Sequence, residues 1–412
     1  MLYESPFEVK NVDETYSELA KSRGVIVFGT GNCGNIVIAA LKKANVKIVY
    51  LSDNNKSKWG TNYLEYKILP PEELKGTYNQ FPVLVASDLS FTYIKNQLRD
   101  LGITNVLDCD FIFSKLDLQL SDCDVTWSKT KIKQKIDLYM FSLLASKEKH
   151  RLFKVSAVDL VLTEKCSLKC IDCSNLMQYY AKPVDEDHDQ VISSIDTFMS
   201  LVDYVLQIRV IGGEPLMYKK IDSIVKHLLT FDNVETIQIN TNGTIVPNDE
   251  KMNVFENNKV YFDISNYGSS SRNVDKLIGE LSRRNIRYNA PNVTSWTDCG
   301  RLVDTNRSDS DLKEVFGNCC ENQGLTILHG KVYLCPFSAH ATNLNAVKSN
   351  SKDVIDLEIS DKVLLKEKIK NLYFNTEYLE ACKSCNGRDN NVRTIDAALQ
   401  TKTPLKYNIV AQ

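Results

Sequence analysis

Three cysteines on one short segment constrain this chain more than any other feature. Cys166, Cys170 and Cys173 have the spacing C-x3-C-x2-C and directly follow Val158–Leu162, an apolar run of strand length. Iron–sulfur clusters normally take four cysteines, so a cluster held by three leaves one iron open. A zinc site would need a fourth ligand, and the next histidine along the chain is His188. The fold must therefore present three thiols at the end of a buried strand.

The setting of these cysteines follows from the N-terminus and the composition. The first residues lack the basic and apolar regions of a signal peptide, and no apolar run approaches the roughly 18–20 residues of a membrane span. We therefore expect a cytoplasmic protein, in which cysteine clusters bind metals or catalyse reactions rather than form disulfides. Lys and Arg number 50 and Asp and Glu 52, so no basic excess favours nucleic acid or membrane partners.

Strand-like and helix-like segments alternate after the cysteine loop. Strands are expected at 206–211, 236–240 and 260–264, and helices at 191–201, 221–229 and 274–283. In such parallel sheets the carboxyl ends of the strands meet at one edge. The strands are followed by Gly212-Gly213-Glu214-Pro215, Thr241-Asn242-Gly243 and Ser265-Asn266. The pattern predicts a partial, TIM-like (β/α)6 barrel with a site at that edge.

The cysteine spacing and these strand ends together resemble the radical S-adenosylmethionine (SAM) superfamily. The resemblance implies a [4Fe–4S] cluster on Cys166, Cys170 and Cys173. It also implies a set of SAM-binding residues, which are Gly212, Gly213, Glu214, Pro215, Asn240, Asn242, Ser265 and Asn266. Such enzymes take one electron from an external donor such as flavodoxin or ferredoxin and form a 5′-deoxyadenosyl radical that abstracts hydrogen. One position departs from the family, because Asp172 stands where an apolar or aromatic residue usually contacts adenine.

Four cysteines near the C-terminus form two pairs, Cys320 with Cys335 and Cys382 with Cys385. Four thiols are a complete ligand set for a second cluster, and a four-cysteine zinc ribbon is the alternative. Downstream of a radical SAM core the pattern resembles the twitch form of the SPASM extension, which implies one auxiliary [4Fe–4S] cluster. With no open iron, that cluster would conduct electrons and suit a net oxidation. Cys319 could replace Cys320 as a ligand, although Cys320 fits the spacing better.

A glycine turn stands near the N-terminus. Gly29, Gly31 and Gly34 follow the strand-like run Val25–Phe28, and Asp53 ends the next expected strand. Glycines at this point let a phosphate approach the backbone, and the acidic residue can hold a ribose hydroxyl. Residues about 20–115 resemble the Rossmann-like domain of bacterial polysaccharide and nucleotide-sugar enzymes, which implies a bound nucleotide or nucleotide sugar. The alternative is a tight turn in a small α/β domain that binds nothing.

We expect an α/β architecture in four parts. These are a Rossmann-like parallel sheet over 1–118, a helical linker over 119–152, the partial barrel over 153–305 and a small α+β iron–sulfur domain over 306–412. Four further residues are candidates for contact with the substrate or for proton transfer: Tyr179, Asp298, Cys299 and His340. We expect Asp298 and Cys299 to follow the fifth strand of the barrel. Packing or surface hydrogen bonding is the alternative for the histidine and the tyrosine.

These features together predict an oxygen-sensitive radical SAM oxidoreductase that acts on a small-molecule substrate. The N-terminal resemblance favours a carbohydrate substrate, either a nucleotide-linked sugar or a cyclitol. The C-terminal resemblance favours oxidation at a hydroxyl-bearing carbon. In this the chain is similar to aminocyclitol dehydrogenases that pair this core with a twitch domain. Sugar epimerisation or elimination, and modification of a peptide or protein, are the alternatives. A zinc-binding interaction protein is a third, non-enzymatic one.

Overall fold

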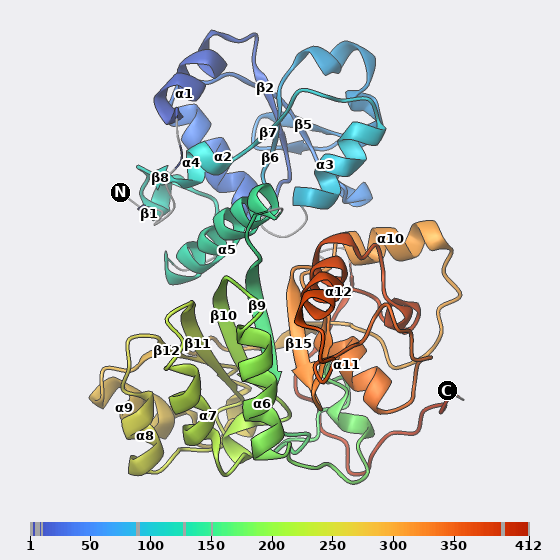
Figure 1. The fold of residues 1–412 in the computed structure, drawn as a ribbon. Helices are drawn as coiled ribbons and strands as arrows, with labels where there is room; N and C mark the ends of the chain where they lie inside the picture. Colours follow the sequence, from blue (N-terminus) through green and yellow to red (C-terminus); the bar gives the residue numbers. More distant parts are fainter. Residues whose placement is uncertain are drawn as a thin grey trace. The chain divides into compact units, whose positions relative to one another are not determined.

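The computed structural model describes residues 3–4, 9, 11–87, 91–126, 129–149, 151–388 and 392–410. The chain divides into two compact units, Met1–Leu144 and Ala145–Gln412 (Figure 1). Each unit has a parallel sheet of its own and is described by itself. In the part of the chain that is described, no helix combines the length and apolar character needed to cross a lipid bilayer.

The first unit is built on a six-stranded sheet with the order β4-β5-β3-β2-β6-β7. Its strands are β2 (Val25–Phe28), β3 (Ile48–Ser52), β4 (Asn62–Tyr63), β5 (Tyr66–Leu69), β6 (Val83–Val85) and β7 (Val106–Asp108). All pairs are parallel except β4 with β5. The parallel strands follow the order 3-2-1-4-5 of a dinucleotide-binding fold without its sixth strand. The expected Rossmann-like parallel sheet is thus confirmed.

Helices cover this sheet and complete its core. They are α1 (Val12–Lys21), α2 (Asn32–Lys43), α3 (Phe91–Asp100), α4 (Asp110–Phe113) and α5 (Lys129–Glu148). A short pair of β1 (Tyr3–Glu4) with β8 (Lys115–Leu116) lies outside the main sheet. From α5, Ile132, Ile136 and Tyr139 are buried in the core of this unit. The helix expected in a linker therefore supplies apolar side chains to the first core.

The second unit contains an eight-stranded sheet with the order β13-β12-β11-β10-β9-β15-β16-β17. Its strands are β9 (Lys154–Val161), β10 (Tyr204–Ile211), β11 (Val234–Thr241), β12 (Val260–Ile264), β13 (Arg287–Asn289), β15 (Gly324–Leu328), β16 (Lys331–Tyr333) and β17 (Ile355–Asp356). Strands β9 to β13 and β15 are parallel, and β16 and β17 are antiparallel additions. No pair among the described residues closes the sheet into a full barrel, which is consistent with the expected partial barrel.

Two strands differ from expectation. The strand directly before Asp298 is β14 (Ser295–Thr297), and it pairs with β18 (Thr394–Asp396) in a separate two-stranded sheet. The expectation that Asp298 follows a strand of the barrel is therefore wrong. The sixth parallel strand, β15, comes from the C-terminal region and pairs with β9. Burial explains the difference, because β15 is buried throughout whereas β14 is half-exposed.

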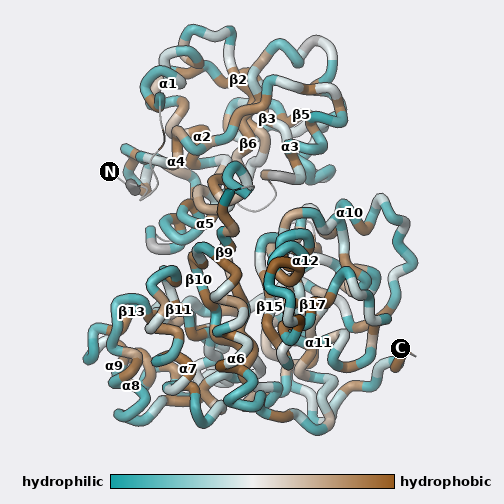
Figure 2. Tube along the Cα trace, viewed as in Figure 1, coloured by the Kyte–Doolittle hydropathy of each residue, from teal (hydrophilic) through white to brown (hydrophobic). Residues whose placement is uncertain are grey.

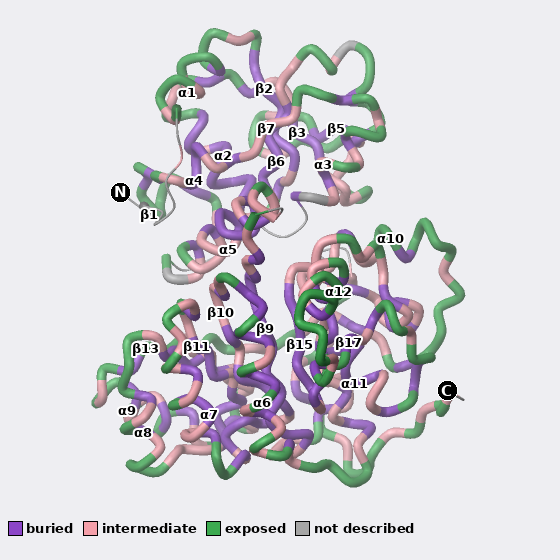
Figure 3. The backbone as a smooth tube through the Cα atoms, viewed as in Figure 1, coloured by how far each residue is buried: buried purple, intermediate pink, exposed green. Residues whose placement is uncertain are grey.

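Helices of the second unit pack along the sheet and cover its apolar strands (Figures 1 and 2). They are α6 (His188–Met199), α7 (Ile221–Leu228), α8 (Asp249–Phe255), α9 (Val274–Arg283), α10 (Asp309–Gly317), α11 (Pro336–Asn343) and α12 (Lys362–Asn375). The core includes buried residues of β9 to β12 together with Leu325 and Ile327 of β15 (Figure 3). The sheet and core of the expected barrel therefore continue into the expected C-terminal domain. The finer four-part division stays a prediction.

Candidate active site

The carboxyl ends of the parallel strands surround a cavity of about 360 Å³ in the second unit, which we call the large cavity to distinguish it from a small one of about 30 Å³ beside the C-terminal cysteines. Cys166, Cys170 and Cys173 line it from the loop that follows β9. Five of the expected SAM-binding residues also line it, namely Gly212, Gly213, Asn240, Asn242 and Ser265. Residues from four strand ends thus meet at one place, as the sequence pattern predicted for a parallel sheet.

Cys170 is buried and Cys166 and Cys173 are half-buried, which disfavours the charged form of all three thiols. Burial and the neighbouring thiol of Cys173 raise the pKa of Cys170 to about 11, and burial likewise raises the pKa of Cys166 and Cys173. A buried thiolate therefore needs a cationic partner such as a metal centre. Among the described residues, no three Cys, His, Asp or Glu side chains converge on a point that would hold one ion. The cysteines instead surround a cavity, which fits a multi-iron group better than a single zinc ion.

Hydrogen-bond donors face the sulfur atoms of this loop. The Leu168 amide donates to Cys166 Sγ at 3.4 Å, and Asn242 Nδ2 donates to the same sulfur at 3.6 Å. Gln400 Nε2 donates to Cys170 Sγ at 3.2 Å. Such donors tune the potential of iron–sulfur clusters. Sequence reasoning missed Gln400, because it lies 230 positions from the cysteine that it contacts.

The glycine turn after β10 packs directly on the cysteine loop. A Cβ on Gly212, whose φ is +152°, would lie 2.4 Å from the Thr163 carbonyl oxygen. A Cβ on Gly213 would lie 2.3 Å from the Lys165 carbonyl oxygen, and the Gly213 amide donates to Thr163 O at 2.8 Å. Both positions therefore require glycine for the two loops to approach each other.

Glu214 is fully buried and joins the ends of β10 and β11. Its carboxylate accepts hydrogen bonds from Thr241 Oγ1 and from the Asn242 amide, both at 2.8 Å, and burial raises its pKa to about 7. Glu214, Pro215 and Asn266 are not among the residues that line the cavity. Their contact with SAM stays a prediction.

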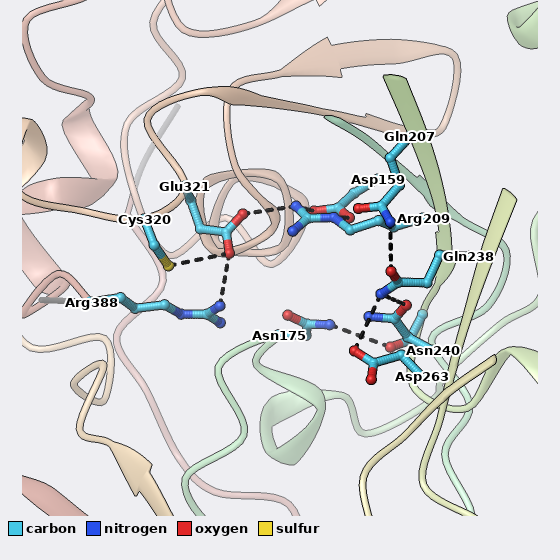
Figure 4. A network of polar contacts seen from close by, with 11 residues as sticks. Asp159, Asn175, Gln207, Arg209, Gln238, Asn240, Asp263, Cys320, Glu321 and Arg388 are labelled. Atoms are coloured by element: carbon cyan, nitrogen blue, oxygen red, sulfur yellow. Dashed lines mark hydrogen bonds and ion pairs between the residues drawn. The ribbon is translucent and has the colours of Figure 1, made fainter. Parts of the chain in front are cut away.

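A row of amide and carboxylate side chains crosses the strands beside the cavity (Figure 4). Gln207 Nε2 donates to Gln238 Oε1 at 2.6 Å, and Gln238 Nε2 donates to Asn240 Oδ1 at 2.7 Å. Gln238 also donates to Asp263 Oδ2 at 3.3 Å. We call Gln207, Gln238, Asn240 and Asp263 the amide row. It presents both donors and acceptors on β10, β11 and β12.

Next to the amide row, four charged side chains alternate in sign (Figure 4). Arg209 donates from Nε and Nη2 to the two Asp159 oxygens at 2.6 and 2.7 Å, and from Nη2 to Glu321 at 2.9 Å. Arg388 donates from Nη1 to Glu321 at 2.9 Å. Burial would raise the pKa of Glu321, but the two guanidinium groups lower it to about 2. We call Asp159, Arg209, Glu321 and Arg388 the charged row.

Of the four expected substrate-contacting residues, Cys299 alone lines the large cavity among those described. Its Sγ accepts from Arg388 Nε at 3.4 Å. Asp298 is buried and ion-paired with Arg393 at 2.6 Å. Tyr179 packs edge-on against another tyrosine. His340 is fully buried, and burial lowers its pKa to about 4. This geometry favours packing for Tyr179 and His340.

Aromatic side chains stand near the unusual Asp172. The Asp172 carboxylate accepts two hydrogen bonds from Arg301, at 2.5 and 3.0 Å, so it forms an ion pair. Tyr267 and Trp296 also line the cavity and pack edge-to-face with ring centroids 5.4 Å apart. They offer an aromatic surface that Asp172 lacks. Sequence reasoning missed both, because neither belongs to a recognised motif.

The C-terminal cysteines surround a second, small cavity of about 30 Å³. Its sulfur-bearing residues are Cys319, Cys335, Cys382 and Cys385. Burial raises the pKa of Cys382 to about 11 and of Cys385 to about 12, so here too thiolates need a cationic partner. Glu321 and apolar side chains such as Phe316 and Leu379 complete the lining, and the four cysteines could hold an iron–sulfur core there.

The N-terminal glycine turn lies in the first unit. A Cβ on Gly34 would lie 2.0 Å from the Gly29 carbonyl oxygen, whereas a Cβ on Gly31 would meet nothing within 4 Å. The Asp53 carboxylate accepts from the Thr30 amide at 2.9 Å and from Lys58 Nζ at 3.2 Å. Asp53 therefore contacts the turn itself. Its binding of a nucleotide ribose stays a prediction.

Two family models match the chain, one in each of the two units. Residues 21–106 match the family described as C2185-like, N-terminal, and residues 160–289 match the radical SAM superfamily. GTP 3′,8-cyclases of Limosilactobacillus fermentum and Lactiplantibacillus plantarum are 31% and 30% identical over 88 residues. That similarity covers 21% of this chain and spans about a quarter, 26%, of each relative.

Solved structures of two proteins with bound AdoMet share a weaker similarity with this chain. BtrN in complex with AdoMet and 2-DOIA has a TM-score of 0.41 and 15% identity, covering 61% of this chain and 98% of that one. Histidine-tagged anSMEcpe with bound AdoMet has a TM-score of 0.38 and 14% identity, covering 62% and 93%. The matched range 160–289 contains the cysteine loop and the glycine turn that meet at the large cavity. The central part of this chain is therefore a radical SAM domain, from a superfamily of enzymes that use SAM and a [4Fe–4S] cluster.

Proposed function

We propose that this enzyme removes a hydrogen atom from a polyhydroxylated small molecule, a carbohydrate or cyclitol, and oxidises the carbon that bears the hydroxyl group. The observation that carries the proposal is that Asn240 of the amide row and Arg388 of the charged row line the large cavity, each held by its own row. Substrate hydroxyls both donate and accept hydrogen bonds, as amide and carboxylate side chains do. The Rossmann-like first unit supports a nucleotide-linked sugar as the form of the substrate.

In this proposal Cys166, Cys170 and Cys173 hold the cluster, and the remaining cavity takes SAM. Bound there, the cluster and SAM would supply the 5′-deoxyadenosyl radical. Asn240 would orient a substrate hydroxyl from the amide row, and Arg388 would hold a substrate oxygen from the other side. Both residues line the same cavity as the three cysteines. Tyr267 and Trp296 would pack on the adenine.

Oxidation at a carbon–hydroxyl group releases two electrons and two protons in all. The radical removes one hydrogen atom, and the hydroxyl loses a proton as a second electron leaves. In this proposal the C-terminal cysteines hold an auxiliary cluster that accepts that electron. An external one-electron donor of the flavodoxin or ferredoxin class would start each turnover.

Epimerisation is a second candidate, because a thiol lines the cavity. Cys299 lies there with its sulfur 3.4 Å from Arg388 Nε. A thiol on the opposite face could return a hydrogen atom to the substrate carbon and invert it. The sulfur radical left behind would then need one electron and one proton, from the auxiliary cluster and solvent. Oxidation needs no such thiol, so the two candidates differ in what Cys299 does.

The first test is the release of 5′-deoxyadenosine by the anaerobically reconstituted, reduced enzyme. Nucleotide sugars, free cyclitols and short peptides are compared as separate panels, and a Cys166→Ala variant is the control without a complete cysteine loop. We expect one sugar or cyclitol to stimulate release, with a ketone product. Stimulation by peptides alone would contradict the proposed substrate class.

A Cys299→Ala variant separates the two candidate reactions. Under oxidation, it should still form product. Under epimerisation, it should consume SAM and fail to deliver the inverted sugar, and the wild-type product should carry solvent deuterium at the inverted carbon.

A further inference from the structure

Two adjacent cysteines follow α10, and they differ in what they face. The chain makes a tight turn here, since the Cys319 amide donates to Phe316 O at 3.1 Å and the Asn322 amide donates to Cys319 O at 3.3 Å. Cys319 lines the small C-terminal cavity, and Cys320 is not among its lining residues. The spacing of the cysteines along the chain favours Cys320, so the structure and the spacing disagree.

We propose that Cys319, and not Cys320, is the fourth sulfur ligand at the C-terminal cysteine site. This inference rests on the auxiliary cluster of the proposed function. The other three sulfurs of the small cavity belong to Cys335, Cys382 and Cys385, so Cys319 completes a set of four around one space. Val315, Phe316 and Leu379 line the same cavity and keep water from it.

Cys320 is engaged by the charged row. Its Sγ donates to Glu321 Oε1 at 3.6 Å, and Glu321 also accepts from Arg209 and Arg388, each at 2.9 Å. Figure 4 shows the Cys320 sulfur directed at the Glu321 carboxylate. The Cys320 thiol also interacts with that of Cys319.

The test compares Cys319→Ala with Cys320→Ala, and Cys335→Ala serves as the reference for loss of the site. Each protein is reconstituted anaerobically, and iron and sulfide are counted per chain. Two [4Fe–4S] clusters correspond to about eight iron atoms and one to about four. We expect about eight for the wild type and Cys320→Ala, and about four for Cys319→Ala and Cys335→Ala. Electron paramagnetic resonance of the reduced proteins should show one cluster signal lost in the same two variants.

At least about four iron atoms in every variant would show that the three-cysteine site, and with it the second unit, has folded. Loss of the second cluster in Cys320→Ala overturns the assignment. So does its retention in both single variants, which would make the two thiols interchangeable. If the wild type and Cys335→Ala both hold only about four iron atoms, the auxiliary cluster itself is absent. That outcome removes the proposed electron acceptor, and it differs from a failure that concerns only the choice of cysteine.

Discussion

Replacing Arg209 by methionine should destabilise the second unit strongly, because it removes the cation between two buried carboxylates. Arg209 makes three short hydrogen bonds to Asp159 and Glu321. Asp159 is 2% exposed, so an uncompensated charge there is not solvated by water. Removing one partner of a buried ion pair costs about 3–5 kcal/mol. At about 2–3 °C per kcal/mol for a unit of this size, we expect the melting temperature to fall by about 6–15 °C.

The loss should depend on pH in a defined direction. Burial already raises the pKa of Asp159 to about 6 with Arg209 present, and removing the guanidinium raises it further. A carboxyl whose folded pKa lies above its unfolded value contributes stability that is complete below the unfolded pKa and is lost as pH rises to the folded pKa. The melting temperature of Arg209→Met should therefore lie closer to that of the wild type at pH 5.5 than at pH 8, where the extra rise in the Asp159 pKa adds to the loss at Glu321.

The assay is thermal unfolding followed by circular dichroism, with the cysteines kept reduced. Arg283→Met is the matched control, because Arg283 forms an exposed pair with Glu280 on α9 at 2.7 Å. An exposed pair of this kind contributes less than about 1 kcal/mol. Adding Asp159→Asn to Arg209→Met should recover part of the loss, since it removes one unpaired charge. Equal melting temperatures for Arg209→Met and Arg283→Met at every pH would refute the reasoning.

Three further predictions concern the glycine turn, a buried histidine and the aromatic surface. Gly213→Ala should reduce the iron bound at the three-cysteine site, because the new Cβ would lie 2.3 Å from the Lys165 carbonyl oxygen. Gly279→Ala is the control, since its Cβ would meet nothing within 4 Å, and counting iron per chain checks both variants. Glu164 and Glu186 raise the pKa of His329 to about 9, so the protonated histidine stabilises the fold. The wild type should therefore melt at a higher temperature than His329→Gln below pH 6.5 and at the same temperature above pH 9, and a difference that is constant with pH would contradict this. Trp296→Leu should weaken SAM binding by about threefold to tenfold in equilibrium dialysis, the loss of about 1 kcal/mol of aromatic contact.

The sequence predicted a strand wherever the strand's own apolar residues indicate it. Val25–Phe28 and Val83–Val85 are buried throughout, so their apolar composition alone indicates buried parallel strands. Position in the sheet was less predictable, because pairing depends on contacts between distant segments. Strand β15 joins β9 across more than 160 residues, and nothing local in its sequence selects that neighbour over β13.

The candidate site divides in the same way. The three cysteines and the glycine turn are short local motifs, so spacing alone located them. Glu321, Arg388 and Gln400 reach the site from the C-terminal region, and each is an ordinary polar residue in sequence. Only the folded chain shows that they contact a cysteine or a residue of the charged row. The choice between Cys319 and Cys320 is limited in the same way. Their spacing along the chain hardly distinguishes them, whereas their side chains lie in different places in the fold.

Arg388 connects the two cysteine sites through the backbone. It stands three residues after Cys385, whose Sγ accepts from the Gly387 amide at 3.3 Å. Gly387 has a φ of +77°, so the chain turns sharply between the sulfur and the guanidinium. Arg388 then lines the large cavity and contacts Cys299. Because one tight turn separates them, a group that fixes the Cys385 sulfur also fixes the guanidinium in the cavity. Under the proposed function, loss of the C-terminal site should therefore weaken substrate binding itself, and not only the electron transfer that follows hydrogen abstraction.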